Sequence, residues 1–144
     1  MNIGRNEILI GVAVVGVAAL ILVPILVSSS KSGQLGEVEQ TVNAIRLAEL
    51  QYHEAFNEYV SADPAPRPQH AVDATPVPWT PTDGFRKLAW APEHELVVGS
   101  YQVQADKNGF KVIGACDLDG DGKRAVFVAT QDEEAHAISN SGVY

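Results

Sequence analysis

The sequence has only one cysteine, Cys116, among its 144 residues. A single cysteine cannot form a disulfide within the chain, so packing and hydrogen bonds must hold the fold together. Free cysteine is among the most often buried residue types, and we therefore expect Cys116 in the core rather than as an exposed reactive thiol.

Basic residues are also scarce. Ten Lys and Arg stand against 18 Asp and Glu, which gives a formal net charge of -8. Binding to phosphate requires a basic stripe, and this sequence offers only the short pairs Arg86-Lys87 and Lys123-Arg124. We expect no nucleic-acid partner.

Catalytic motifs are missing as well. The sequence contains no nucleophile elbow, phosphate-binding loop or metallohydrolase helix. The four histidines show no ligand spacing with Cys116 or with one another: His53, His70, His94 and His136. The sequence therefore does not predict an enzyme.

Charge is absent altogether from residues 8–27, which read ILIGVAVVGVAALILVPILV. About 20 apolar residues are enough to cross the hydrocarbon core of a bilayer as a helix, so we expect one membrane span. Arg5 before the run favours a cytoplasmic N-terminus. The alternative is a cleaved secretory signal peptide, although its apolar core usually runs for only about 7–15 residues.

The next segment has the pattern of an amphipathic helix, interrupted by Glu49. Its apolar residues recur at spacings of three and four: Leu35, Val38, Val42, Ile45, Tyr52, Phe56 and Tyr59. The helix should stop before Pro64, because two further prolines follow it closely. The chain thus divides into a membrane-spanning half of a long helix (1–30), an amphipathic half (31–63) and an outer domain (64–144).

Strand patterns dominate the outer domain after a proline-rich connection. We expect strands within 85–90, 96–105, 110–116, 125–130 and 135–138, with Asn108-Gly109 as a hairpin turn. Trp79 and Trp90 are expected to pack on the sheet. The sequence predicts an α+β fold, in which the long N-terminal helix covers one face of a small antiparallel sheet of about four strands.

Acidic residues alternate in the segment Asp117-Leu118-Asp119-Gly120-Asp121-Gly122. Carboxylates at alternate positions, with glycine in the turn, can direct their oxygens at a hard cation such as Ca²⁺. The motif is not an EF-hand, because Val128 occupies the place of the bidentate glutamate. Two interpretations stay open, a Ca²⁺ site formed by the three aspartates and a solvated β-hairpin turn.

The order of these parts resembles that of the type IV pilins: an apolar helix, its amphipathic continuation, a loop and an antiparallel sheet. Glu7, Gly16 and Pro24 reproduce a spacing typical of the family. The segments GFRKLAWAP and GACDLDGDGKRAVFV are similar to the sheet region of one pilin subgroup. The resemblance covers nearly the whole chain. It departs from the family at the leader, because Asn2 stands where a glycine would precede the mature N-terminus.

The resemblance implies a structural subunit of a type IV pilus-like filament with the pilin fold. Glu7 would neutralise the terminal amine of a neighbouring subunit, while Gly16 and Pro24 shape the packed helix. The implied partners are copies of the chain or other pilins, the inner membrane before assembly, and the pilus assembly machinery. The implied location is the bacterial inner membrane, with a single span, and then the extracellular pilus.

The resemblance leaves the kind of filament subunit open, and the sequence also allows a protein of a different class. Pseudopilins of type II secretion share the outline and also bind calcium near their C-terminal loop. Major and minor pilins cannot be told apart from one sequence. A chain that never polymerises, a membrane-anchored or secreted binding domain with a possible dependence on Ca²⁺, is the rival of a different class.

Overall fold

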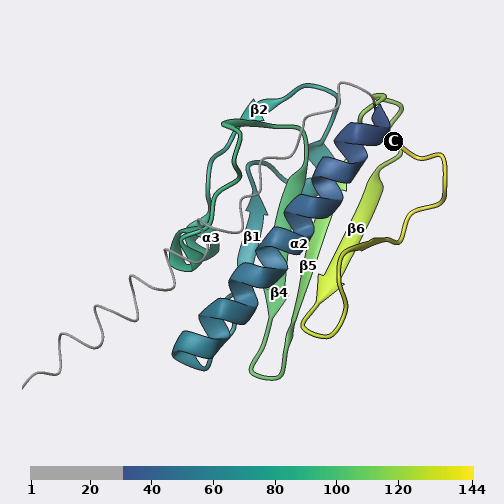
Figure 1. The fold of residues 1–144 in the computed structure, drawn as a ribbon. Helices are drawn as coiled ribbons and strands as arrows, with labels where there is room; N and C mark the ends of the chain where they lie inside the picture. The colour runs from purple at the N-terminus through teal and green to yellow at the C-terminus, as the bar shows by residue number, and fades with distance from the viewer. Residues whose placement is uncertain (1–30) are drawn as a thin grey trace, which may run out of the picture.

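The computed structural model describes residues 31–144 of the chain. The predicted membrane span at 8–27, and with it Glu7, Gly16 and Pro24, lies outside the described residues. The described part is α+β, with one long helix lying across an antiparallel sheet (Figure 1). At this level the predicted fold class is confirmed.

Three helical elements and seven strands make up the described part. The helical elements are α2 (Lys31–Phe56), the 3-10 turn η1 (Gln69–Ala71) and α3 (Asp83–Leu88). The strands are β1 (Ala62–Ala65), β2 (Val77–Pro78), β3 (Leu96–Val97), β4 (Ser100–Ala105), β5 (Phe110–Cys116), β6 (Ala125–Thr130) and β7 (His136–Ala137). The main sheet has five strands in the order β1-β4-β5-β6-β7, and β2 pairs with β3 separately.

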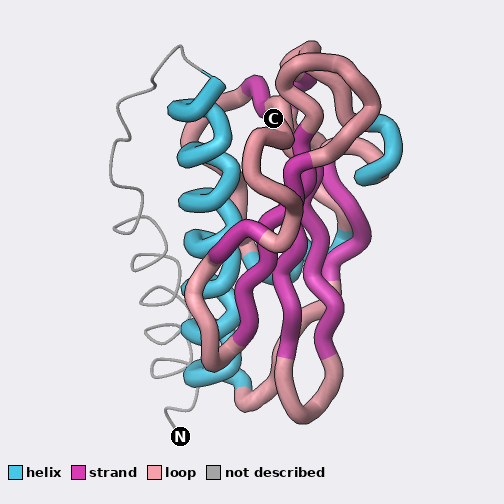
Figure 2. Tube along the Cα trace, turned by 90° about the vertical axis from the view of Figure 1, so that its right-hand side faces the viewer, coloured by secondary structure: helices cyan, strands magenta, loops and turns pink. Residues whose placement is uncertain are grey.

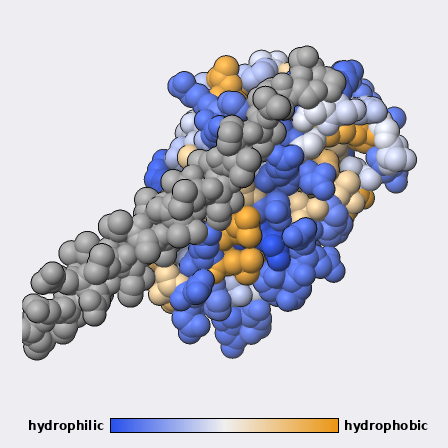
Figure 3. All heavy atoms as spheres, viewed as in Figure 1, coloured by the Kyte–Doolittle hydropathy of each residue, from blue (hydrophilic) through white to orange (hydrophobic). Residues whose placement is uncertain are grey.

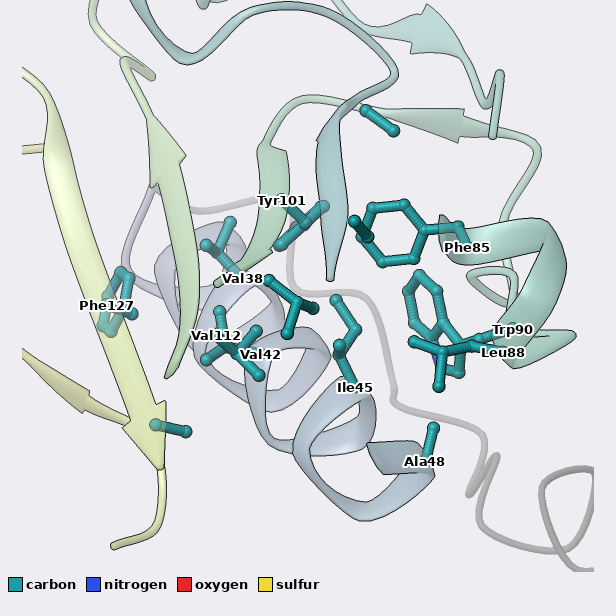
Figure 4. Close-up of a cluster of buried hydrophobic side chains, with 14 of the residues drawn as sticks. Val38, Val42, Ile45, Ala48, Phe85, Leu88, Trp90, Tyr101, Val112 and Phe127 are labelled. Carbon is teal, nitrogen blue, oxygen red and sulfur yellow. The ribbon is translucent and has the colours of Figure 1, made fainter. Parts of the chain in front are cut away.

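The apolar stripe of α2 faces the sheet, as the spacing predicts. Val38, Val42 and Ile45 are buried against β4, β5 and β6, where Tyr101, Val112 and Phe127 point back at the helix (Figure 4). Figure 2 shows the helix and the strands as two layers seen from the side. The closeness of the layers depends on Gly114 of β5, because a Cβ there would lie 2.4 Å from Cγ2 of Val42.

The helix ends three residues before the last member of the predicted stripe. Asn57 adopts a left-handed conformation, with φ of 55°, and its N–H donates to the carbonyl of His53 at 2.7 Å. Such a residue closes a helix, and asparagine tolerates it better than most. Tyr59 lies beyond the helix, yet its ring still stacks on His53, with centroids 4.1 Å apart.

The central hairpin of the sheet follows the predicted turn. Ala105 of β4 is paired with Phe110 of β5, and residues 106–109 form the connection. Asp106 fixes this turn, because its carboxylate accepts the N–H groups of Asn108 at 2.7 Å and Gly109 at 3.1 Å. The strands predicted at 110–116, 125–130 and 135–138 are confirmed as β5, β6 and β7.

The prediction of a strand at 85–90 is wrong, because these residues belong to α3 and its C-terminal cap. Phe85 and Leu88 are both buried, and their spacing of three places them on one helical face. Ala89 then takes φ of 52°, and its N–H and that of Trp90 bond back to the last turn. Asp83 at the start of α3 and basic residues at its end suit the helix dipole.

The proline-rich connection contains a strand that the sequence pattern missed. β1 pairs with β4 at the sheet edge through an irregular register, Ala62 with Val103 and Ala65 with Tyr101. The connection beyond β1 is held down by Arg67, whose Nη2 donates to the carbonyl groups of Val98 and Thr75, each at 3.1 Å. The predicted strand 96–105 is divided, because β3 leaves the main sheet to pair with β2 in this connection.

Apolar rings of the connection and of α3 form a second part of the core. Trp79 contacts Phe85 edge-on at a centroid distance of 5.2 Å and Trp90 at 5.5 Å. The two tryptophans are therefore packing residues, and they contact each other and Phe85. On the face seen in Figure 3, hydrophilic residues cover most of the coloured surface, and hydrophobic residues appear only in small separate areas.

The expected location in the inner membrane and the extracellular pilus is corrected by the helices observed. Within residues 31–144, no helix combines the length and the apolar composition that crossing a bilayer requires. The longest of them, α2, carries charged side chains along its length: Lys31, Glu37, Glu39, Arg46, Glu49 and Glu54.

Candidate metal centre

The alternating aspartates lie in the loop that joins β5 to β6. Cys116, the last residue of β5, is paired with Ala125, the first of β6, so the loop leaves and re-enters the sheet at one point. Asp117 and Leu118 are buried at the base of the loop, whereas Asp119 and Asp121 are exposed at its tip. The paired strands therefore fix both ends of the acidic loop.

The carboxylate of Asp117 organises the loop from inside. Its Oδ1 accepts the N–H of Gly120 and its Oδ2 accepts the N–H of Gly122, both at 2.9 Å. Gly120 and Gly122 have φ of 71° and 84°, a region that side chains rarely adopt. Glycine at these two positions lets the loop curl around the buried carboxylate.

The two exposed aspartates continue the same pattern. Asp119 Oδ1 accepts the N–H of Asp121 at 3.2 Å, and Asp121 Oδ1 accepts the N–H of Lys123 at 2.8 Å. One oxygen from each of Asp117, Asp119 and Asp121 lies within 4.8 Å of the others. The structure thus brings the three predicted residues together, and this cluster could hold a metal ion.

The surroundings of the cluster limit its other ligands. Val128 lies in β6, paired with Ile113 and His136, so no carboxylate stands where an EF-hand would have one. Among residues 31–144, the group of nearby carboxylates consists of these three aspartates alone, without Glu133 or Glu134. Glu133 instead lies 4.0 Å from the imidazole Nε2 of His136.

The neighbouring thiol is not a further ligand. Cys116 is fully buried, as predicted, and burial followed by the nearby charge of Asp117 raises its pKa to about 12. The group of possible ligand atoms contains the three aspartates and does not include Sγ of Cys116. None of the four histidines joins a metal-binding group in the described part of the chain.

A buried carboxyl on α2 is the functional feature that the sequence pattern missed. Glu49 has an exposed fraction of 0%, although the pattern marks it only as an interruption of the apolar stripe. Its Oε2 accepts the N–H of Val60 at 2.9 Å, and its Oε1 has no hydrogen-bond partner among the described residues. The burial of Glu49 could have been predicted from its position, because it follows Ile45 by four residues and therefore lies on the same face of the helix.

Desolvation raises the pKa of Glu49 to about 7, against an ordinary value of 4.5. The hydrogen bond from Val60 and the charge of Lys87 act in the opposite direction and only partly offset this effect. Glu49 is therefore the one buried carboxyl among the described residues whose raised pKa lies near neutral pH.

Comparison with known proteins identified no relative of the chain. No protein-family model, no curated protein and no solved structure matches the chain. The function is therefore inferred from the sequence pattern and the geometry of the described residues.

Proposed function

We propose that the chain is a structural subunit of a type IV pilus-like filament and that it has the pilin fold. The observation that carries the proposal is the amphipathic helix α2, which lies along one face of an antiparallel sheet. In the sequence, the apolar run 8–27 directly precedes this helix, with Glu7, Gly16 and Pro24 at the spacing typical of pilins.

In this proposal the apolar run provides the contact between subunits. Small residues such as Gly11, Ala13 and Gly16 let helices approach closely. A carboxylate placed among apolar helices is costly unless an opposite charge pairs with it. Glu7 would thus select the register in which a neighbouring subunit offers its terminal amine. The partners are further copies or related pilins, together with the machinery that assembles them.

We expect the variant Glu7→Ala to be produced normally but to be lost from filaments. The missing carboxylate leaves the neighbouring amine unpaired, so incorporation should fall at least tenfold, which corresponds to about 1.4 kcal/mol. Mass spectrometry of filaments sheared from cells measures the fraction incorporated, relative to the total amount of the chain.

Glu54→Ala is the matched control, because it removes an exposed glutamate from α2 and should leave incorporation unchanged. Normal incorporation of Glu7→Ala would contradict the assembly role of this residue. Absence of the unaltered chain from sheared filaments would contradict the filament proposal itself. It would favour instead the alternative that the aspartate loop supports, a binding domain that depends on Ca²⁺ and does not polymerise.

We further propose Ca²⁺ as the ion that the aspartate loop takes, as in pseudopilins of type II secretion or in such a binding domain. Three carboxylates supply oxygen ligands of the kind that Ca²⁺ prefers. Mg²⁺ demands a stricter octahedral arrangement at shorter distances, so it should bind less well in this loop.

Addition of 5 mM Ca²⁺ should raise the melting temperature and release heat in a calorimetric titration. For a dissociation constant between about 0.1 and 1 mM, the stabilisation is roughly 1–2 kcal/mol. The double variant Asp119→Asn, Asp121→Asn should lose this response, because each amide keeps one oxygen for the turn but carries no charge. Absence of both heat and thermal shift at millimolar Ca²⁺ would exclude the site.

A further inference from the structure

Residues 57–61 connect α2 to β1, and we call this segment the hinge. It is hydrogen-bonded to one buried side chain of α2, that of Glu49. Helix α2 ends at Phe56, Asn57 reverses the chain with φ of 55°, and β1 begins at Ala62. Val60, midway along the hinge, is 4% exposed and donates its N–H to Glu49 Oε2 at 2.9 Å. Glu49 therefore ties the hinge to the helix across eleven residues of sequence.

The second oxygen of the Glu49 carboxyl is also buried, but it differs from the first in its hydrogen bonding. Oε1 of Glu49 is buried and has no hydrogen-bond partner among the described residues. A buried carboxylate that is only half satisfied is costly, whereas the protonated acid is tolerated much better. The closed hinge thus favours the protonated form of Glu49 over the ionised form.

The groups around Glu49 compensate the burial of its charge only in part. Lys87 of α3 is the cation whose charge acts on Glu49, and its Nζ is already paired with Glu58 Oε1 at 3.0 Å. Glu58 also accepts the hydroxyl of Tyr52 at 3.3 Å, so the ion pair is held on the outside of the hinge. Arg46, one turn before Glu49, donates to the carbonyl groups of Thr130 and Gln131 instead.

Further titratable groups near this part of the core lie on the sheet, at the end of α2, in the hinge and in β1. The face of the sheet that packs on α2 carries Tyr101 and Cys116, and burial raises the pKa of both. His53 and Tyr59 stack on each other at the outer side of the hinge. In β1 the only charged residue is Asp63, which is exposed. Tyr101 and Cys116 therefore stay neutral over the range in which Glu49 ionises.

We propose that Glu49 is a pH-sensitive latch, which holds the hinge 57–61 against the end of α2 while its carboxyl is protonated and loosens that hinge when it ionises. In the loosened state the carboxylate reaches water, and the hydrogen bond to Val60 is broken. The latch acts on the segment that connects the long helix to the first strand of the sheet. It does not depend on whether the chain polymerises.

The direction of the pH dependence follows from linkage. Burial raises the pKa of Glu49 to about 7 in the closed state, whereas an open, solvated carboxyl returns to about 4.5. Closure is therefore favoured most below pH 4.5, is progressively lost as the pH rises from 4.5 to 7, and changes little above that. A difference of this size allows the open population to rise by up to about 300-fold.

Amide NMR of the full-length chain, labelled with ¹⁵N and purified in a mild detergent, tests the latch. The Val60 amide signal should titrate with a midpoint near pH 7. Its hydrogen-exchange protection, corrected for intrinsic rates, should fall at least tenfold between pH 5 and pH 8. The amides of Val112 and Ala129, in the centre of the sheet, should keep their protection over the same range.

Two variants make the result specific to this carboxyl. Glu49→Gln should abolish the titration and the pH-dependent loss of protection at Val60, because the amide cannot ionise. Glu54→Gln, on the exposed part of the same helix, should change neither. The proposal is overturned if Val60 titrates near pH 4.5 or not at all in the unaltered chain, or if its titration survives in Glu49→Gln. If Glu49→Gln does not fold, the titration of the unaltered chain still decides the matter.

Discussion

The variant Gly84→Ala is expected to lose about 3 kcal/mol of unfolding free energy, at the upper end of the range of about 1–3 kcal/mol that overpacking of a core usually costs. Gly84 lies at the start of α3, where the helix touches β1. A Cβ at this position would lie 2.1 Å from the carbonyl oxygen of Ser61 and 2.4 Å from Cα of Ala62. Both are backbone atoms, so no side chain can rotate away, and α3 must separate from β1.

Urea denaturation of the full-length chain, followed by tryptophan fluorescence, measures this loss. Trp79 and Trp90 pack beside Phe85, so their emission reports on the position of α3. Gly36→Ala is the matched control, because no described atom lies within 4 Å of a Cβ built there. In the helix it should stabilise the chain by about 0.5–1 kcal/mol. Equal stability of the two variants would show that α3 and β1 are not in close contact.

Ile45→Ala should cost about 2–5 kcal/mol, the usual range for removing a large aliphatic side chain from a core. Ile45 is fully buried in the middle of α2, between the residues of the sheet and the cluster that contains Leu88 and Trp90 (Figure 4). Its side chain therefore belongs to both parts of the core. Its removal leaves a cavity that neither layer can close without moving away from the other.

The conservative variant Ile45→Val provides the scale for this measurement. It removes one methylene and should cost about 0.5–1.5 kcal/mol. Chemical denaturation with unchanged slope would show that both variants act on the folded state. If Ile45→Ala costs no more than Ile45→Val, then α2 does not pack on the sheet as described.

Periodicity was enough to predict the amphipathic face of α2 and the central strands. Val38, Val42 and Ile45 repeat at helical spacing, and β6 coincides with the apolar run 125–130. The Asn108-Gly109 turn and the burial of Cys116 were also predictable, since each depends on the intrinsic preference of one or two residues. In these places local pattern and tertiary packing agree.

Other elements were not predictable because tertiary contacts decided them. Residues 85–90 are too few to show a clear period, and α3 forms because Phe85 and Leu88 can both reach the core from a helix. Strand β1 contains a proline, and it is a strand only because β4 accepts its pairing. The five strands of the main sheet therefore exceed the four expected.

The two candidate sites differ in the same way: the aspartate loop follows from local sequence, whereas the contact of Glu49 depends on tertiary structure. Asp117, Asp119 and Asp121 are close in sequence, so their convergence could be expected from the glycine-containing loop alone. The partnership of Glu49 with Val60 depends on where the chain goes after Asn57, which no spacing reveals. A carboxyl within an apolar stripe indicates a buried acid, but only the structure shows that its hydrogen-bond partner is Val60.

The edges of the sheet have a consequence for how copies of this chain can meet. One edge strand, β1, includes Pro64, which has no N–H to offer a new strand. The opposite edge strand, β7, is only two residues long. A short or interrupted edge is a poor template for strand addition, and natural proteins use such edges to resist aggregation. Many copies can therefore be crowded together without their sheets merging into amyloid-like ribbons.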